Sequence, residues 1–270
     1  MLKDITLGQF FPGKTVVHRL DPRTKLLMTV LYIVALFVAG SWVSYGLVLA
    51  FLVMSVALSR IRPKTILRGM KPVVIIVVLT AVLNLFYTGG DHVLARFWGI
   101  TITWEGVRTA IFMASRIIML ITGTFLLTYT TSPIALTDGL ESLLGPLKKL
   151  RLPVHELSMM MCIALRFIPT LIEETDKIMN AQKARGAQLD TGKMTDRVKA
   201  LVPVLIPLFI SAFRRADELA MAMECRCYRG GDGRTRLKVL RCEKQDYIDL
   251  AVCIACFAVI LASRLVFPNF

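Results

Sequence analysis

Two arginines lie between small residues in the second half of the chain, in Ala184-Arg185-Gly186 and Cys225-Arg226-Cys227. Small neighbours let another backbone approach closely, and a guanidinium in a narrow pocket forms charge-assisted hydrogen bonds. Each such bond contributes on the order of 1.5–3 kcal/mol. One interpretation of each triplet is therefore an arginine tip that a partner protein recognises. The other is an ordinary helix end, where the helix dipole favours a basic residue.

The residues before the two triplets follow one plan. Ile168-Pro169 precedes Arg185 by 16 positions, and Ile206-Pro207 precedes Arg226 by 19. In each case an apolar helical stretch leads to a proline, which should kink the helix, and a charged stretch follows. Two similar tips predict a partner with two similar pockets, hence a dimer or pseudo-dimer.

One motif suggests nucleotide chemistry. Residues 8–15, Gly-Gln-Phe-Phe-Pro-Gly-Lys-Thr, match the phosphate-binding P-loop pattern letter for letter. That loop needs a preceding strand, a following helix and an α/β domain. Only seven residues precede it, and a long apolar run begins at Leu26. We therefore reject the motif, and we expect neither a catalytic residue nor a bound cofactor in this chain.

Metal and redox chemistry have little support. His155-Glu156 begins like a zincin motif, but Met159 stands where the second histidine is required. Cys225, Cys227 and Cys242 are irregularly spaced for a zinc site. Cys253 and Cys256 form a CxxC pair inside an apolar run, without the context of a redox motif. We expect no metal site and no disulfide framework.

The composition indicates that the arginine triplets and the other motifs belong to a membrane protein. The chain has 270 residues, of which 55% are hydrophobic and 19% charged, with a net charge of +14 and a mean hydropathy of +0.62. Residues 26–59, 72–90 and 117–137 form uncharged runs, and about 18 uncharged apolar residues already predict a membrane span. These features exclude an ordinary soluble enzyme, a disordered chain and a secreted disulfide scaffold.

Five membrane-spanning helices are expected. The first run has 34 residues, or about 51 Å as one helix, which exceeds a hydrocarbon core of about 30 Å. Gly40-Ser41 should divide it. The expected spans are Leu26–Ala39, Trp42–Leu58, Pro72–Tyr87, Val107–Tyr129 and Tyr247–Val266.

The spans predict an all-α integral membrane protein with three parts. Residues 1–130 form an N-terminal membrane domain with four spans, and residues 131–246 form a cytoplasmic domain of long helices. Residues 247–270 form a final span with a short external tail.

The basic residues predict the orientation. Residues 1–25, 60–71 and 131–246 together carry 29 of the 33 Lys and Arg residues, whereas the alternate loops carry only Arg96. By the positive-inside rule, the N-terminus is cytoplasmic and Phe270 is external. The positive charge therefore indicates membrane topology rather than nucleic-acid binding.

Two arginines lie inside the fourth expected span. Arg108 is near its outer end, where a long side chain can reach the interface. Arg116 is deeper and needs a polar partner, for which Asn84 of the third span is a candidate. A charge within a span indicates function by default, so a structural contact and a role at a partner interface both stay open.

The segment 131–246 should form amphipathic helices. Ser132-Pro133 marks the start of one that Gly145-Pro146 ends. A long helix should follow from Pro153 to about Ala184, and another from Val198 to about Glu224. The apolar half of the first helix contains three consecutive methionines, a residue type that suits adaptable interfaces. Packing of these methionines against one another is an equal alternative.

Taken together, these residues resemble a known family, the transmembrane T component (EcfT) of energy-coupling factor (ECF) transporters. These are ABC-type importers of micronutrients in prokaryotes. The similarity covers essentially the whole chain. The segments that carry it are His18 to Lys25, Thr131-Ser132-Pro133, Ala164 to Thr170, Ala181 to Gly186 and Ala222 to Gly231.

The resemblance implies a function. In this family the T component is a scaffold that joins a substrate-binding S component to two cytoplasmic ATPases, which hold the ATP and Mg. Its crossed coupling helices end in Ala-Arg-Gly motifs that dock into grooves on the ATPases. Ala184, Arg185 and Gly186 match the motif fully, whereas Cys225, Arg226 and Cys227 keep only its arginine.

The resemblance also implies that the apolar halves of these helices contact the S component. The residues of that expected interface are Met159, Met160, Met161, Leu165, Phe167, Leu205, Leu208 and Phe209. The protein would then be a non-enzymatic part of vitamin or micronutrient uptake in a prokaryotic cell membrane, similar to T components shared among several S components. A T component dedicated to cobalt or nickel is an alternative. A more distant one is a membrane-embedded metal-dependent hydrolase.

Overall fold

The computed structural model describes residues 10–13, 15–89, 93–97, 100–146, 153–187, 194–230, 240 and 242–266. Part of the P-loop-like segment (Gly8, Gln9 and Lys14) and the expected external tail after residue 266 lie outside the described residues. The chain divides into two compact units. We call Gly8–Gly139 with Leu240–Phe270 the bundle unit, and Met1–Leu7 with Leu140–Val239 the arm unit. The domain boundaries expected at residues 131 and 247 remain predictions.

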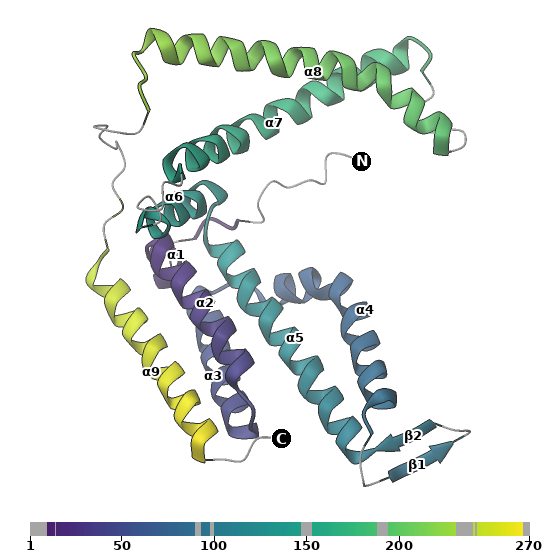
Figure 1. Ribbon diagram of the computed structural model, residues 1–270, viewed down its shortest axis with the longest axis vertical. Helices are drawn as coiled ribbons and strands as arrows, with labels where there is room; N and C mark the ends of the chain where they lie inside the picture. Colours follow the sequence, from purple (N-terminus) through teal and green to yellow (C-terminus); the bar gives the residue numbers. More distant parts are fainter. Residues whose placement is uncertain are drawn as a thin grey trace. The chain divides into compact units, whose positions relative to one another are not determined.

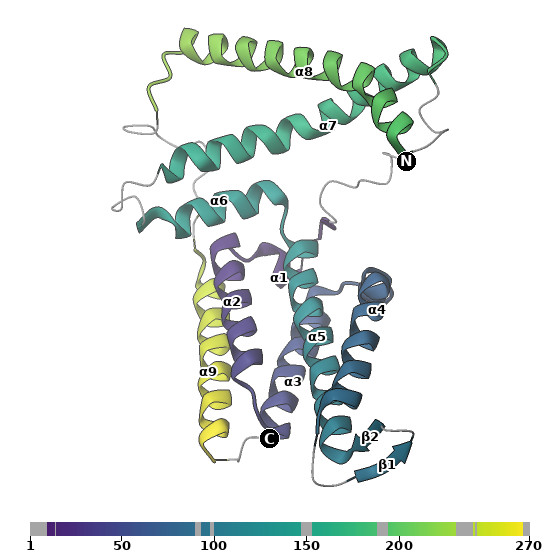
Figure 2. The ribbon, with the colours of Figure 1, turned by 45° about the vertical axis from the view of Figure 1, so that its right-hand side comes forward.

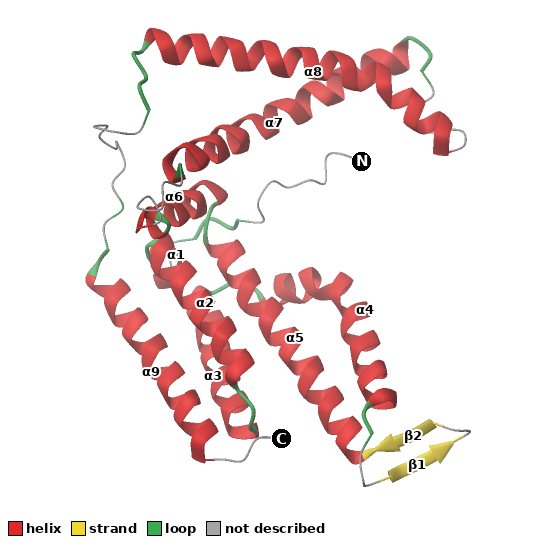
Figure 3. Cartoon of the chain, in the orientation of Figure 1, coloured by secondary structure: helices red, strands yellow, loops and turns green. Residues whose placement is uncertain are grey.

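The bundle unit consists of helices and one small hairpin (Figures 1 and 3). Its elements are α1 (Val16–Arg19), α2 (Pro22–Val38), α3 (Trp42–Ser59), α4 (Pro63–Tyr87), β1 (Val93–Phe97), β2 (Ile100–Thr103), α5 (Trp104–Thr130) and α9 (Lys244–Val266). The boundary between the units falls within α6 (Pro133–Leu143). The all-α membrane fold class is confirmed. The antiparallel β1–β2 pair lies in the loop expected at residues 88–106.

Local sequence accounts for the start of α2 and α3. The Asp21 carboxylate accepts the backbone N–H of Arg23 at 2.9 Å, and Pro22 occupies the first turn of α2. The Ser41 hydroxyl caps α3. The break expected at Gly40-Ser41 is therefore confirmed, because the long uncharged run forms two helices of 17 and 18 residues.

Five described helices are long and apolar enough to cross a membrane, the expected number, but one of them differs from the expected set. α3, α4, α5 and α9 correspond to expected spans, and the fifth is α7 (Val154–Ala184) of the arm unit. With 17 residues, α2 is about 26 Å long, slightly below the hydrocarbon thickness. Its contacts with α3, α5 and α9 allow neighbouring helices to compensate for the short span.

α4 is longer than its expected span. It begins at Pro63, nine residues before Pro72, so Pro72 lies inside the helix. Figures 1 and 2 show α4 bent between a short first segment and a longer second one. A proline in a helix interior removes one backbone hydrogen bond and kinks the helix, which accounts for the bend. The apolar run alone underestimates the helix because the first segment carries Lys64, Arg68 and Lys71.

The bundle core forms around α2. Leu36 is fully buried, and Val48 of α3 is almost so. The Tyr32 hydroxyl donates to the carbonyl of Met119 in α5 at 2.9 Å. A Cβ at Gly123 would lie 2.4 Å from the Tyr32 ring, so the glycine permits the close approach of α2 and α5. Small residues have this role in membrane helix packing generally.

One buried carboxylate joins α9 to the start of α2, 225 positions earlier in the chain. Asp246, only 4% exposed, accepts the backbone N–H of Asp21 at 2.8 Å and that of Glu243 at 2.7 Å. Hydrogen bonds to a charged acceptor are stronger than neutral ones. We call this arrangement the Asp246 contact.

The arm unit contains two long helices, α7 with 31 residues and α8 (Met194–Cys225) with 32. The expected internal prolines are present, Pro169 in α7 and both Pro203 and Pro207 in α8. Figures 1 and 2 both show the helices crossing and running in opposite directions, with α8 bent in its first half. Their C-terminal ends therefore point away from each other within the unit.

Candidate functional site

The first arginine triplet forms the end of α7. Arg185 is the C-cap, with φ −82° and ψ 4°, and Gly186 has a left-handed φ of +88°. The N–H of Gly186 donates to the carbonyl of Lys183, and the N–H of Ala187 donates to that of Gln182, both at 3.0 Å. These two bonds form the Schellman arrangement that ends many helices. Residues 184–186 are all exposed.

The second triplet ends α8 in the same way. Arg226 follows the last helical residue, and Cys227 has a left-handed φ of +55°. The N–H of Cys227 donates to the carbonyl of Glu224 at 2.8 Å, and the N–H of Tyr228 donates to that of Met223 at 3.0 Å. Residues 225–227 are exposed. The departure from Ala-Arg-Gly therefore changes the side chains but preserves the backbone path.

Substitutions at the two left-handed positions should have opposite effects. Cys227→Gly should strengthen the end of α8 by about 1 kcal/mol, because a Cβ costs about 1–2 kcal/mol in this conformation. Gly186→Ala should weaken the end of α7 by a similar amount. Hydrogen exchange of the Tyr228 and Ala187 amides, which close the two Schellman loops, measures each effect. Unchanged exchange rates in both variants would contradict the expectation.

Between the tips, Glu174 of α7 joins the two helices. Its carboxylate accepts a hydrogen bond from the Ser211 hydroxyl and forms an ion pair with Arg215 at 3.2 Å, both on α8. The Arg215 guanidinium also lies 5.8 Å from the centroid of the Phe167 ring, within cation–π range. This crossing contact between α7 and α8 is not among the contacts predicted from the sequence. The available signal was Ser211 and Arg215 four residues apart, and therefore on one helix face.

A carbonyl freed by proline provides a second contact between the helices. The Pro203 carbonyl would normally accept the N–H four residues later, but residue 207 is proline and has none. Gln182 Nε2 of α7 donates to this carbonyl at 3.3 Å. Pro207 thus leaves the Pro203 carbonyl available to accept a hydrogen bond from α7. The proline spacing alone did not predict this contact.

The crossing contact should be measurable by a double-mutant cycle with Glu174→Ala and Arg215→Ala. The side chains are 25% and 34% exposed, so we expect a coupling energy of about 0.5–1 kcal/mol in the free energy of unfolding. Glu173→Ala with Arg214→Ala, two exposed neighbours on the same helices, is the matched control cycle. Equal coupling in the two cycles would mean that the crossing contact has no specific energy.

The residues expected to contact an S component fall into two groups. Met160, Met161, Leu205 and Phe209 are exposed, whereas the others are partly buried: Met159, Leu165, Phe167 and Leu208. The exposed group continues along α8, where Phe213 is 69% exposed. The arm unit therefore carries exposed apolar side chains on both α7 and α8.

Arg116 contacts Tyr45 rather than Asn84. Arg116 Nε donates to the Tyr45 hydroxyl at 2.7 Å, and Nη2 donates to the Ala39 carbonyl at 3.4 Å. Asn84 donates to the carbonyl of Thr80 within its own helix at 2.8 Å. The expected pairing is replaced because α5 packs against α2 and α3 as well as α4, and Asn84 satisfies its donor locally.

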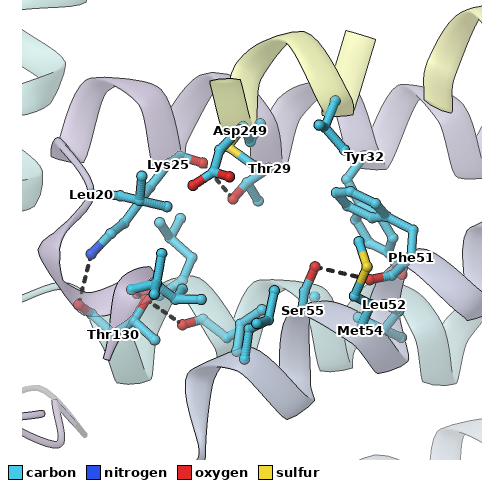
Figure 4. A pocket seen from close by; sticks show the side chains of 18 residues that line it. Leu20, Lys25, Thr29, Tyr32, Phe51, Leu52, Met54, Ser55, Thr130 and Asp249 are labelled. Atoms are coloured by element: carbon cyan, nitrogen blue, oxygen red, sulfur yellow. Dashed lines mark hydrogen bonds between the residues drawn. The ribbon is translucent and has the colours of Figure 1, made fainter. Parts of the chain in front are cut away.

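A largely apolar pocket lies between α1, α2, α3, α5 and α9 (Figure 4). Lys25 and Asp249 are the charged residues of its lining. The Lys25 amino group donates hydrogen bonds to two backbone carbonyl oxygens, those of Thr130 at 3.0 Å and His18 at 3.2 Å. In the described part of the chain, no three His, Cys, Asp or Glu side chains are grouped to hold a metal ion.

The fold and the site together define a class. The chain is a multi-pass helical membrane protein that carries two long crossed helices, each ending in an exposed arginine within a Schellman turn.

Comparison with known proteins identifies the family. The CbiQ family, described as cobalt transport protein, matches residues 13–237. The chain is 52% identical over 266 residues to the energy-coupling factor transporter transmembrane protein EcfT of Clostridium kluyveri, with 98% of each chain covered. It is 56% identical over 245 residues to the EcfT protein of Thermosediminibacter oceani, covering 91% of this chain and 92% of that one. The chain belongs to this family of transmembrane components of ECF transporters.

Proposed function

We propose that this chain is the coupling scaffold of an ECF-type importer of vitamins or other micronutrients. It joins two cytoplasmic ATPase subunits to a substrate-binding S component and transmits ATP-driven motion between them. The observation that carries the proposal is the pair of exposed arginine tips, which share one Schellman geometry and point in opposite directions (Figure 1). Two tips of one shape fit two similar pockets, one on each ATPase subunit.

Each tip presents a guanidinium beyond the last helical turn. In the ATPase-binding set Ala184, Arg185 and Gly186, the small flanks leave room for the walls of a groove. Cys225 and Cys227 serve the same purpose around Arg226, since cysteine is small and mostly apolar. A guanidinium offers five N–H donors, so a groove lined by carboxylates or carbonyls can hold it through several bonds.

The crossing contact gives the two helices a common pivot. ATP binding in the partner subunits would change the distance between their grooves, and the arginine tips would follow. Because Glu174 bonds to Ser211 and Arg215 in the second half of both helices, a displacement of the tips would turn α7 against α8. The apolar surface formed by Met160, Met161, Leu205, Phe209 and their neighbours would carry that motion to the S component.

We also propose how the chain is oriented in the membrane and which subunits hold the cofactors. The N-terminus is cytoplasmic and the C-terminus external, because the basic residues gather in residues 1–25, 60–71 and 131–246. This chain binds no cofactor of its own, and ATP and Mg are held by the ATPase subunits.

A second candidate is a T component dedicated to cobalt or nickel. The description of the matching family as cobalt transport protein favours it, whereas the relatives named EcfT favour a shared ECF scaffold. Co-expression with S components of different substrate class distinguishes the two. Recovery of several S components supports the shared scaffold, and recovery of a metal-specific one alone supports the dedicated form.

The native cysteines at the second tip provide a direct test of docking. Cys225 and Cys227 are exposed, so maleimide should label both in the isolated chain and neither in a complex with the ATPase subunits. Cys242, also exposed, is the internal control. Desolvation and the carboxylates of Asp21 and Asp246 raise the pKa of its thiol, so it needs a longer labelling time. Equal labelling of the tip cysteines with and without ATPases would contradict the proposal.

A further inference from the structure

Arg116 and its neighbours line a cavity of about 450 Å³ in the bundle unit. The walls come from the end of α2, the start of α3 and the first half of α5. Glu105, Arg108 and Arg116 are the charged residues of the lining, and aromatic rings form much of the remainder, with Phe37, Tyr45 and Phe112. A cavity that combines two guanidinium groups, one carboxylate and aromatic walls is suited to an amphipathic ligand.

The lengths of the helices create this cavity. Arg116 lies twelve residues after Trp104, the first residue of α5, or about 18 Å along the helix. At that level it bonds to Ala39 in the connection between α2 and α3. The short helix α2 thus ends beside the middle of α5, and the first turns of α5 continue beyond it. A bundle that is thinner than the bilayer at one side leaves room there for the headgroup region of the membrane.

Arg116 is held in place by its neighbours, and both Arg116 and Glu105 retain capacity to bind a ligand. The Arg116 guanidinium lies 5.8 Å and 5.7 Å from the ring centroids of Phe37 and Tyr45, in cation–π range. Its hydrogen bonds to the described residues use Nε and Nη2, and a guanidinium has five N–H donors, so donors remain for a ligand. Glu105 Oε2 is buried without a hydrogen-bond partner among the described residues. A buried acceptor without a donor is costly, so a ligand with an N–H or O–H group would satisfy it.

We infer that this cavity binds a phospholipid headgroup, with the phosphate held by Arg116 and Arg108 and an ammonium or hydroxyl group donating to Glu105. The planar fork of arginine matches phosphate geometry. Ethanolamine and glycerol headgroups carry both the phosphate and a donor, whereas a choline headgroup has no N–H or O–H. The aromatic rings would cover the lipid backbone next to the headgroup. This inference does not depend on the proposed scaffold function.

Native mass spectrometry of the full chain in detergent tests the inference. The probes are phosphatidylglycerol, phosphatidylethanolamine and phosphatidylcholine of identical acyl chains, each with and without inorganic phosphate as competitor. We expect the first two lipids to bind more tightly than phosphatidylcholine. Arg116→Gln should weaken all three by about tenfold or more, as for the loss of a charge-assisted hydrogen bond. Arg68→Gln, the same charge change at an exposed residue of α4, should leave the affinities unchanged.

Glu105→Met provides an independent variant if Arg116→Gln folds poorly. It should bring the three lipids to nearly equal affinity, because it removes the acceptor and leaves the arginines. Inorganic phosphate should not displace bound lipid. Displacement by phosphate would overturn the lipid assignment in favour of a simple anion site. Equal affinities of the three lipids for the wild type, or equal weakening by Arg68→Gln and Arg116→Gln, would overturn the inference as a whole.

Discussion

Replacing both tip arginines by glutamate, Arg185→Glu with Arg226→Glu, is expected to abolish recovery of ATPase subunits with the chain. A buried charge contact that is broken on one side costs about 3–5 kcal/mol, or more than about a hundredfold in affinity per tip. The reversed charge adds repulsion from any carboxylate in the groove. Co-purification from detergent with a pair of ECF ATPases measures the effect, with membrane insertion followed in parallel. Each single variant should weaken recovery, because each tip would occupy its own pocket.

The matched control is Lys177→Glu with Arg214→Glu. Both residues are exposed on the same two helices, and the double variant changes the net charge equally. It should retain the ATPases. If the tip variant also retains them, the two arginines are ordinary helix ends favoured by the helix dipole. If the wild type recovers no ATPase, the proposed scaffold function itself fails.

Asp246→Ala is expected to lower the free energy of unfolding of the bundle unit by about 3–5 kcal/mol. The carboxylate accepts two backbone N–H groups at 2.8 Å and 2.7 Å, and each hydrogen bond to a charged group contributes about 1.5–3 kcal/mol. The variant also leaves the Asp21 N–H without its acceptor at a buried position. Asp246→Asn should lose less, since one oxygen remains as an acceptor. Unfolding in a denaturing detergent titration measures both variants.

Glu243→Ala is the control for the Asp246 contact. It removes an acidic side chain that is exposed but keeps the backbone N–H that donates to Asp246. Its effect on unfolding should be within about 0.5 kcal/mol. Similar losses for Asp246→Ala and Glu243→Ala would mean that the Asp246 contact does not hold α9 against α2.

The two tips show which features of a helix end can be predicted from the local sequence and which cannot. Gly186 is a recognisable helix stop, because glycine adopts the left-handed conformation at little cost, and the sequence placed the end of α7 correctly. Cys227 adopts the same conformation at the end of α8 although cysteine is not a stop signal. The equivalence of the tips was readable from the arginine and proline spacing, whereas their identical hydrogen bonding was not.

The set of candidate membrane spans shows a second limit of prediction from the sequence. An uncharged run predicts burial in an apolar environment, but it does not distinguish a membrane span from an apolar surface that a partner covers. α7 therefore qualifies as a span by length and composition, although it belongs to the segment 131–246 that the sequence predicts to be cytoplasmic. α2 has 17 residues and lies among neighbours that only the fold reveals.

The sequence by itself determined the membrane class, the helix break at Gly40-Ser41 and the position of both arginine tips. These features depend on hydrophobic periodicity, capping and charge within a few residues of one another, so short stretches of sequence are enough to determine them. Only the tertiary structure decided that Arg116 bonds to Tyr45, that Glu174 joins α7 to α8 and that Asp246 reaches Asp21 across 225 positions. In nearly uncharged spans many polar pairings are compatible with the same composition, and the packing of the helices selects among them.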